Sequence, residues 1–161
     1  MKAKFLLFDW GNTIMVDFGF PGPMFTWEKA AWVDGAEDAL KKLAGHTLCI
    51  ATNAGSSDSE AVKKGLAMVG ADKYFTFIFS SWDIGFVKPD PRFFGFVTDA
   101  LKTHPSDCIM IGDNYKKDIT GAKTAGMKTI LFNPSNLEGP FPDADAVIVE
   151  MQNLPKIIEK L

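Results

Sequence analysis

FLLFDWGNT, residues 5–13, runs from four apolar residues to an aspartate and then into a polar turn. An apolar run without polar interruption indicates a strand that is covered on both faces, as the strands of parallel sheets are. In the turn that follows, Asn12 is a residue type that tolerates unusual backbone angles, so we expect it to shape the turn. The stretch predicts a buried strand that places Asp9 at its carboxyl end.

The rest of the chain alternates short β-type runs with helical patterns. This alternation is typical of a parallel sheet with helices on both faces. We therefore expect an α/β fold with a single doubly wound, Rossmann-like sheet, in one domain that spans residues 1–161. Further strands are predicted at 46–52, 75–81, 107–113, 127–132 and 146–149. Helices are predicted at 37–44, 57–70, 90–103 and 116–126.

Composition and charge exclude several classes of protein. With 161 residues, 47% hydrophobic and 23% charged, the chain fits one globular domain with an adequate core. A net charge of −3 provides no bulk positive charge for nucleic acid or a membrane surface, and no apolar run approaches a membrane span. Asp9 interrupts the apolar amino-terminal stretch too early for a signal peptide. Cys49 and Cys108 fall inside predicted strands without metal-like spacing, so we expect reduced core residues and a cytoplasmic protein.

Polar residues follow four of the predicted strands at the point where each strand ends. They are Asp9, Thr52 with Asn53, the segment leading to Lys88, and Asp113. In an open parallel sheet, ligands bind outside the carboxyl ends of the strands, where the order of connections reverses. Four complementary polar groups at such ends predict a binding site at this edge of the sheet.

The chemistry of these residues points to a phosphoryl group and a cation. If their strands are neighbours, Asp9 and Asp113 lie close together, and like charges at that distance require a positive partner. A hard cation such as Mg²⁺, which prefers oxygen ligands, meets this requirement. Lys88 adds a fixed positive charge, and Thr52 with the following backbone amides adds hydrogen-bond donors. Together these groups suit a phosphoryl group, whose transfer depends on positioning and charge stabilisation.

Four segments lie in order between the predicted strands and helices. They are FLLFDWGNT (5–13), IATNAG (50–55), FVKPDPRFF (86–94) and IMIGDNYKKDITGAKTAGM (109–127). These segments resemble the four ordered motifs of the haloacid dehalogenase-like hydrolases, which are mostly Mg²⁺-dependent phosphatases. The resemblance covers nearly the whole chain, and around the third motif it is particularly similar to the small-molecule phosphatases of that family.

The resemblance implies an enzyme that works through an aspartyl-phosphate intermediate. Asp9 matches the nucleophile, and Lys88 matches the residue that neutralises both the phosphoryl group and Asp9. Thr52, with the backbone amide of Asn53, matches the phosphate-binding group. The implied Mg²⁺ ligands are Asp9, the backbone carbonyl of Gly11, Asp113 and Asp118. Asp118 also fits a simpler role at the start of a helix, where a carboxylate interacts favourably with the helix dipole.

Gly11 and Asn12 depart from the first motif of the family. Relatives usually carry a second aspartate at the position of Gly11, which protonates the leaving group and later activates water, and glycine at the position of Asn12. A positioned general acid–base contributes about 10²–10⁴-fold in rate. Its loss favours leaving groups that need no proton, as in acyl phosphates and activated phosphonates. Asp17 either takes over this role from the neighbouring segment or belongs to an ordinary surface turn.

Residues 14–34, IMVDFGFPGPMFTWEKAAWVD, combine helix-breaking Gly and Pro with too many aromatic residues for a solvated loop. The segment either packs its aromatics back on the domain as a hairpin, covers the site as a flap, or contacts a second copy of the chain. The connections between the first three motifs are too short for the helical cap domain of many relatives, so we expect an open site. Such a site suits a phosphorylated small molecule or an exposed phosphorylated group on a larger one, with a homodimer through residues 14–34 as one means of covering it.

The sequence leaves three functions open. The first is a Mg²⁺-dependent hydrolase of the haloacid dehalogenase type, a phosphatase in which Asp9 attacks phosphorus. The second is a catalytically impaired protein that keeps the metal and phosphate site and serves as a binding or regulatory partner. The third is a phosphonate or halide hydrolase on the same fold. Asp113 and Asp118 favour a cation and so argue against the halide reaction, which needs none.

Overall fold

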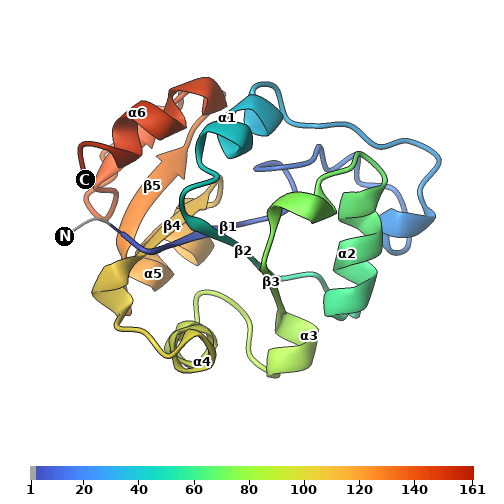
Figure 1. The fold of residues 1–161 in the computed structure, drawn as a ribbon, viewed down its shortest axis with the longest axis horizontal. Coiled ribbons are helices and arrows are strands. Elements are labelled where there is room, and N and C mark those ends of the chain that lie inside the picture. Colours follow the sequence, from blue (N-terminus) through green and yellow to red (C-terminus); the bar gives the residue numbers. More distant parts are fainter. Residues whose placement is uncertain (1–2) are drawn as a thin grey trace.

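The computed structural model describes residues 3–161 and contains a six-stranded sheet whose neighbouring strands are all parallel (Figure 1). The strand order is β3-β2-β1-β4-β5-β6. From β1 the chain adds β2 and β3 on one side, and it then returns to place β4, β5 and β6 on the other side of β1. This arrangement confirms the predicted α/β fold. The strands are β1 (Phe5–Phe8), β2 (Thr47–Thr52), β3 (Phe77–Ser80), β4 (Cys108–Gly112), β5 (Lys128–Phe132) and β6 (Ala146–Ile148).

Helices cover both faces of the sheet, as predicted (Figure 1). On one face lie α1 (Ala36–Lys42), α2 (Ser59–Ala67) and α6 (Leu154–Ile158). On the other lie α3 (Ser81–Ile84), α4 (Pro91–Leu101) and α5 (Gly121–Thr124). Each face has its own apolar cluster: Leu6 and Phe8 of β1 belong to one, and Leu7 belongs to the other. The unbroken apolar run of β1 follows from this two-sided burial. Short 3₁₀ turns are η1 (Met24–Thr26), η2 (Asp72–Tyr74), η3 (Pro105–Asp107) and η5 (Met151–Asn153).

The start of α4 is fixed by local sequence and anchors the segment that carries Lys88. The Asp90 side chain accepts a hydrogen bond from the Arg92 N–H at 2.9 Å, and Pro91 occupies the first helical position. Phe93 is fully buried on the sheet side of the helix. Because the cap lies two residues after Lys88, it restricts the path by which that lysine enters the sheet edge.

The segment predicted as one helix over 116–126 is divided in the structure. A wide π-helical turn, η4 (Tyr115–Thr120), continues as α5. Asn114 Oδ1 accepts from the Lys117 N–H at 2.9 Å, and the Asn114 N–H donates to Asp118 Oδ2 at 3.0 Å, so side-chain hydrogen bonds shape the first turn. No prediction covers α3 or α6, which have four and five residues. Helices this short show too few apolar positions for periodicity to reveal them.

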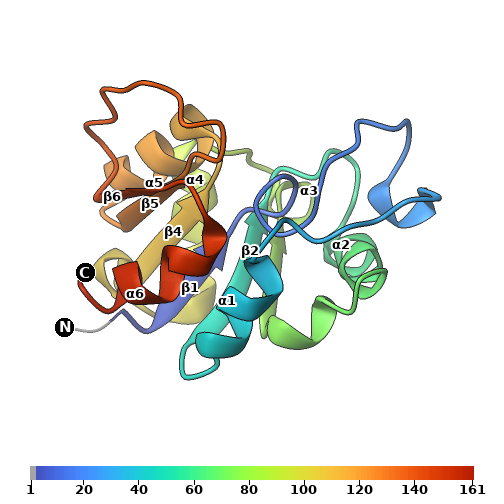
Figure 2. The same cartoon turned by 90° about the horizontal axis from the view of Figure 1, so that it is seen from above.

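Residues 14–34 follow an irregular path at one end of the sheet, with η1 beside α2 (Figures 1 and 2). Met15 and Trp32 share an isolated antiparallel bridge, so these residues form a pinched loop rather than a regular hairpin. Met15 is fully buried, and Trp32 Nε1 donates to the Val69 carbonyl at 3.1 Å, which anchors both ends of the loop. In its outer part, Phe20 packs against both Phe18 and Trp27. The aromatic residues therefore pack partly on one another and not only on the domain.

Cys49 in β2 and Cys108 in β4 are free and fully buried, in agreement with their predicted place in the core. Burial raises the pKa of the Cys49 thiol to about 12 and the pKa of the Cys108 thiol to about 11. Neither is therefore a reactive thiolate at neutral pH. Within residues 3–161, no helix has the length and apolar character needed to span a membrane.

Candidate active site

Asp9 and Asp113 meet where the sheet reverses its winding. β1 and β4 are neighbours, yet the strands that follow each of them lie toward opposite edges. Phe8 pairs with Ile111, whose carbonyl accepts the Asp9 N–H at 3.0 Å. In open α/β sheets, ligands bind in the crevice at this switch point. The strand order therefore confirms that the strands of the two aspartates are neighbours.

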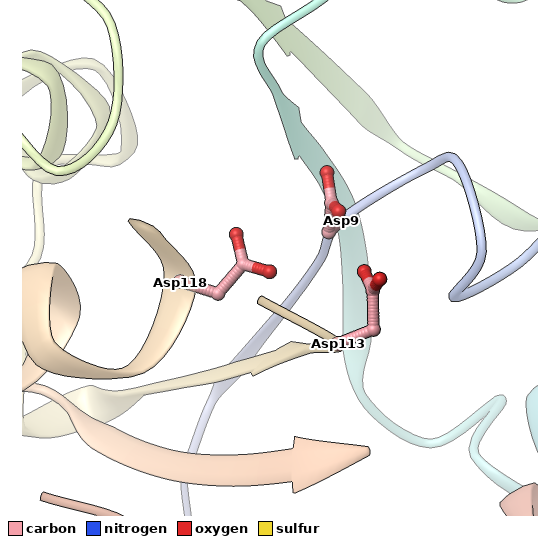
Figure 3. A group of neighbouring side chains, drawn as sticks. All are labelled: Asp9, Asp113 and Asp118. Atoms are coloured by element: carbon pink, nitrogen blue, oxygen red, sulfur yellow. The ribbon is translucent and has the colours of Figure 1, made fainter. Parts of the chain in front are cut away.

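The carboxylates of Asp9, Asp113 and Asp118 form one acidic cluster at this edge (Figure 3). One oxygen of each lies within 4.8 Å of the others. Asp118 reaches the cluster from η4, and Gly112 makes this approach possible because a Cβ atom at residue 112 would overlap the Asp118 carboxylate. Oxygen ligands gathered at this spacing are suited to a hard divalent cation.

Lys88 lies beneath the acidic cluster with only 2% of its surface exposed. Its ammonium donates to Asp118 Oδ1 at 2.6 Å, to the Ala51 carbonyl at 2.8 Å and to Asp9 Oδ1 at 3.1 Å. Three acceptors match the three protons of an ammonium. Burial by itself would lower the pKa of Lys88, but the carboxylates of Asp9 and Asp118 outweigh burial and raise it. The lysine therefore remains a fixed positive charge at the site.

Asn53 holds the backbone of Lys88 in place. Asn53 Oδ1 accepts the Lys88 N–H at 2.8 Å, and Asn53 Nδ2 donates to the Lys88 carbonyl at 2.9 Å. The Asn53 side chain is thus engaged with the chain itself, which leaves its backbone amide for the predicted contact with phosphate. That contact stays a prediction. Thr52, which ends β2, is buried and lines a cavity together with Asp9.

The acidic cluster carries more negative charge than Lys88 balances. Burial, followed by the charges of Asp9 and Asp118, raises the pKa of Asp113 to about 7, although a hydrogen bond from Thr13 opposes the shift. Burial also raises the pKa of Asp118 to about 6, against the lowering effect of Lys88. Because three carboxylates face a single ammonium, Asp113 and Asp118 bind protons more tightly than ordinary aspartates do. A divalent cation would compete with these protons.

Thr13 and Ala51 contribute to the site and lie outside the sequence-based prediction. Thr13 Oγ1 donates to Asp113 Oδ1 at 3.1 Å, and the Ala51 carbonyl accepts from Lys88. Thr13 and Asp113 are 100 residues apart, so no local pattern links them. The one available signal is that Thr13 ends the first motif, directly after the turn that follows Asp9.

A cavity of about 410 Å³ borders the acidic cluster. Asp9, Gly11 and Thr52 contribute to its polar lining, and Phe20 and Trp27 contribute to its apolar lining. Residues 14–34 therefore form part of the wall of the site. The predicted homodimer through this segment stays a prediction.

A family model described as haloacid dehalogenase-like hydrolase matches residues 22–126. This range contains Thr52, Lys88, Asp113 and Asp118 and leaves out Asp9. A ribulose-1,5-bisphosphate 5-phosphatase of Halopiger xanaduensis is 28% identical over 125 residues, which are 78% of this chain and 52% of the relative. A phosphoserine phosphatase of Thermus thermophilus is 35% identical over 86 residues, 53% of this chain and 33% of the relative. The chain spans between 17% and 52% of the length of the first curated relatives that it matches.

A solved structure resembles the chain over its whole length. An uncharacterized protein from Listeria monocytogenes serotype 4b superimposes with a TM-score of 0.84 and 25% sequence identity, covering 99% of this chain and 100% of that protein. The family model covers more than half of the chain, and the residues that it contains converge on one site in the structure. The chain therefore belongs to the haloacid dehalogenase-like hydrolases.

Proposed function

We propose that the protein is a Mg²⁺-dependent phosphatase that transfers a phosphoryl group to Asp9 and then to water. The convergence of Asp9, Asp113, Asp118 and Lys88 at the switch point of the sheet carries this proposal. Two relatives named as phosphatases, of ribulose-1,5-bisphosphate and of phosphoserine, support the choice of reaction. The proposed substrate is a phosphorylated small molecule or an exposed phosphorylated group on a larger one.

The residues of the acidic cluster fit Mg²⁺. Carboxylate oxygens are ligands that this hard cation prefers, and three of them lie within 4.8 Å of one another. Gly11, whose carbonyl is the fourth proposed ligand, lines the cavity beside Asp9. Lys88 and the Asn114 N–H each engage one oxygen of Asp118, so Asp9 and Asp113 offer the freer oxygens. When bound, Mg²⁺ would supply positive charge that offsets the charge of the phosphoryl group.

The two transfer steps depend on three side chains, those of Asp9, Lys88 and Thr52. In the first step an Asp9 oxygen attacks phosphorus and the leaving group departs, and in the second step water attacks the aspartyl-phosphate and frees phosphate. Lys88 Nζ lies 3.1 Å from Asp9 Oδ1, so its charge lies next to the phosphoryl oxygens during both steps. Thr52 lines the same cavity and supplies a hydroxyl for a phosphoryl oxygen.

Removal of the metal tests this function. With Mg²⁺ we expect release of phosphate from acetyl phosphate and p-nitrophenyl phosphate, and with excess EDTA we expect release to fall to background. The reason is that a cluster of carboxylates without a cation repels a phosphoryl group. Inorganic phosphate is measured over time, before and after Mg²⁺ is restored. Undiminished release in EDTA would contradict the proposal. No release from any phosphorylated compound, together with Mg²⁺ binding that needs Asp113, would favour the binding or regulatory protein.

Mg²⁺ should stabilise the folded protein more at about pH 8 than at about pH 5. The pKa values of Asp113 and Asp118 in the folded protein, about 7 and about 6, lie above the ordinary 3.8. The folded state therefore binds more protons than the unfolded state, and the metal-free protein loses stability as pH rises from about 4 to about 7. A cation that binds the ionised carboxylates offsets this loss and adds about 2.7 kcal/mol at about a hundred times its Kd.

Thermal unfolding with and without Mg²⁺ at both pH values measures this effect. Asp113→Asn keeps the size of the side chain and removes one titrating group, so it should flatten the pH dependence and weaken the effect of Mg²⁺. A Mg²⁺ effect of the same size at both pH values would argue against the acidic cluster as the cation site.

A further inference from the structure

Gly11 has no side chain, and Asp17 lies next to the space that a side chain at residue 11 would enter. A Cβ atom built on Gly11 would lie 3.4 Å from Asp17 Cβ and 3.6 Å from Asp17 Oδ2. The Asp17 carboxylate therefore occupies space next to the point from which relatives usually project their second aspartate. We propose that Asp17 is the general acid–base of the phosphatase reaction, an inference that rests on the proposed function.

Asn12 and Gly19 hold Asp17 in this place. Asn12 has a φ of +59°, the left-handed conformation, which confirms that it shapes the turn. Asn12 Oδ1 accepts the Asp17 N–H at 2.9 Å, and Asp17 Oδ1 accepts the Gly19 N–H at 2.8 Å. These bonds fix the backbone and one carboxylate oxygen of Asp17, while Oδ2 is the oxygen nearest to Gly11. The two departures from the family motif thus meet at one place: Gly11 has no side chain in the space beside Asp17, and Asn12 positions Asp17.

Asp17 shares a cavity with the proposed nucleophile. Asp9, Gly11, Asp17 and Thr52 all contribute to the lining of the 410 Å³ cavity. In an in-line displacement the leaving group departs from phosphorus opposite to the attacking Asp9 oxygen, into the space that this cavity provides. Asp17 is exposed, so its carboxyl group is accessible to a leaving group and to water.

The two steps balance with Asp17 as the proton carrier. In the first, Asp9 attacks phosphorus, the electron pair of the broken P–O bond goes to the leaving oxygen, and the protonated Asp17 carboxyl gives that oxygen its proton. In the second, the Asp17 carboxylate takes a proton from the water that attacks phosphorus, and the bond between phosphorus and Asp9 breaks. One cycle converts a phosphate ester and water into an alcohol and inorganic phosphate, and both aspartates return to their starting forms.

Asp17 also has a simpler role, because an aspartate that accepts the N–H two residues ahead is common in turns. Asp17→Asn separates the two roles. The asparagine keeps an oxygen for the Gly19 N–H, but its amide neither gives nor takes the proton. A loss that depends on the leaving group therefore reports proton transfer, which a turn residue would not affect.

The test compares ethyl phosphate, whose leaving group needs a proton, with acetyl phosphate, whose leaving group does not. Asp17→Asn should lower kcat/KM for ethyl phosphate by about 10²–10⁴-fold and leave kcat/KM for acetyl phosphate nearly unchanged. Because the second step also loses its base, the variant should accumulate phosphorylated protein with acetyl phosphate, detected by mass spectrometry after acid quenching. Asp58→Asn is the matched control, since Asp58 also accepts a backbone N–H, from Ala61, and does not line the cavity.

A carboxylate moved back to residue 11 provides a second check. The double variant Gly11→Asp/Asp17→Ala should hydrolyse ethyl phosphate faster than Asp17→Ala alone, and so recover part of the wild-type activity. Equal losses for both substrates, no loss for either, or a wild-type protein without activity toward alkyl phosphates would overturn the role of Asp17. Turnover of acetyl phosphate that needs Asp9 would still support the proposed function in each of these cases. If acetyl phosphate is not turned over, the result contradicts the proposed function itself and therefore also the role of Asp17.

Discussion

Asp9→Asn is expected to abolish phosphate release while leaving the fold intact. In the proposed reaction, Asp9 supplies the oxygen that attacks phosphorus, and an amide at that position is a far weaker nucleophile. Loss of a nucleophile that acts as part of a unit costs on the order of 10⁶-fold in kcat. Release from acetyl phosphate in Mg²⁺ should therefore fall to background, and no phosphorylated protein should form.

The stability of the same variant distinguishes a chemical loss from a folding defect. The asparagine that replaces Asp9 keeps an oxygen for the Lys88 ammonium, which lies 3.1 Å from Asp9 Oδ1 in the wild type. The charge of Asp9 is one of the causes that raise the pKa values of Asp113 and Asp118, so its removal relieves repulsion in the metal-free protein. We expect the metal-free variant to unfold at the same temperature as the wild type or higher. Equal turnover by variant and wild type would exclude Asp9 as the nucleophile.

Lys88→Met should damage both stability and activity. The Asp118 side chain is 1% exposed and forms an ion pair with the Lys88 ammonium at 2.6 Å. Removing one partner of a buried pair leaves an uncompensated charge and costs about 3–5 kcal/mol. Phosphate release should be lost as well, because the charge beside Asp9 disappears. Urea denaturation gives the free energy of unfolding, and the phosphate assay gives the activity.

The double variant Lys88→Met/Asp118→Asn separates these effects. Without the buried carboxylate, most of the lost stability should return, whereas activity should not. The single variant should also regain stability as pH falls, because the pKa of Asp118 rises further when Lys88 is absent and protonation removes the buried charge. Lys123→Met, which breaks the more exposed pair with Asp145, should cost no more than about 1 kcal/mol. A single Lys88 variant as stable as Lys123→Met would contradict this account of the buried pair.

The core of the site is predictable from sequence because it lies at strand ends. β1 and β4 are short apolar runs, and each is followed directly by an aspartate, so parallel pairing alone brings Asp9 and Asp113 together. The contact between Thr13 and Asp113 depends on the path of the turn after β1, which residue types do not specify. The position of Asp17 against Gly11 depends in turn on the left-handed conformation of Asn12. A search for polar residues at strand ends does not reach Asp17, which lies within an irregular loop, and only the absence of an aspartate at residue 11 makes it one of two alternatives in the sequence.

The three acceptors around Lys88 have a consequence for a chain emerging from the ribosome. The acceptors belong to residues 9, 51 and 118, so the last of them is synthesised thirty residues after the lysine. Until Asp118 has left the exit tunnel, the Lys88 ammonium lacks its shortest ion pair. Burying this ammonium in the sheet is therefore less favourable before that point than in the complete fold. The switch point of the sheet is therefore completed only when the segment carrying Asp118 arrives.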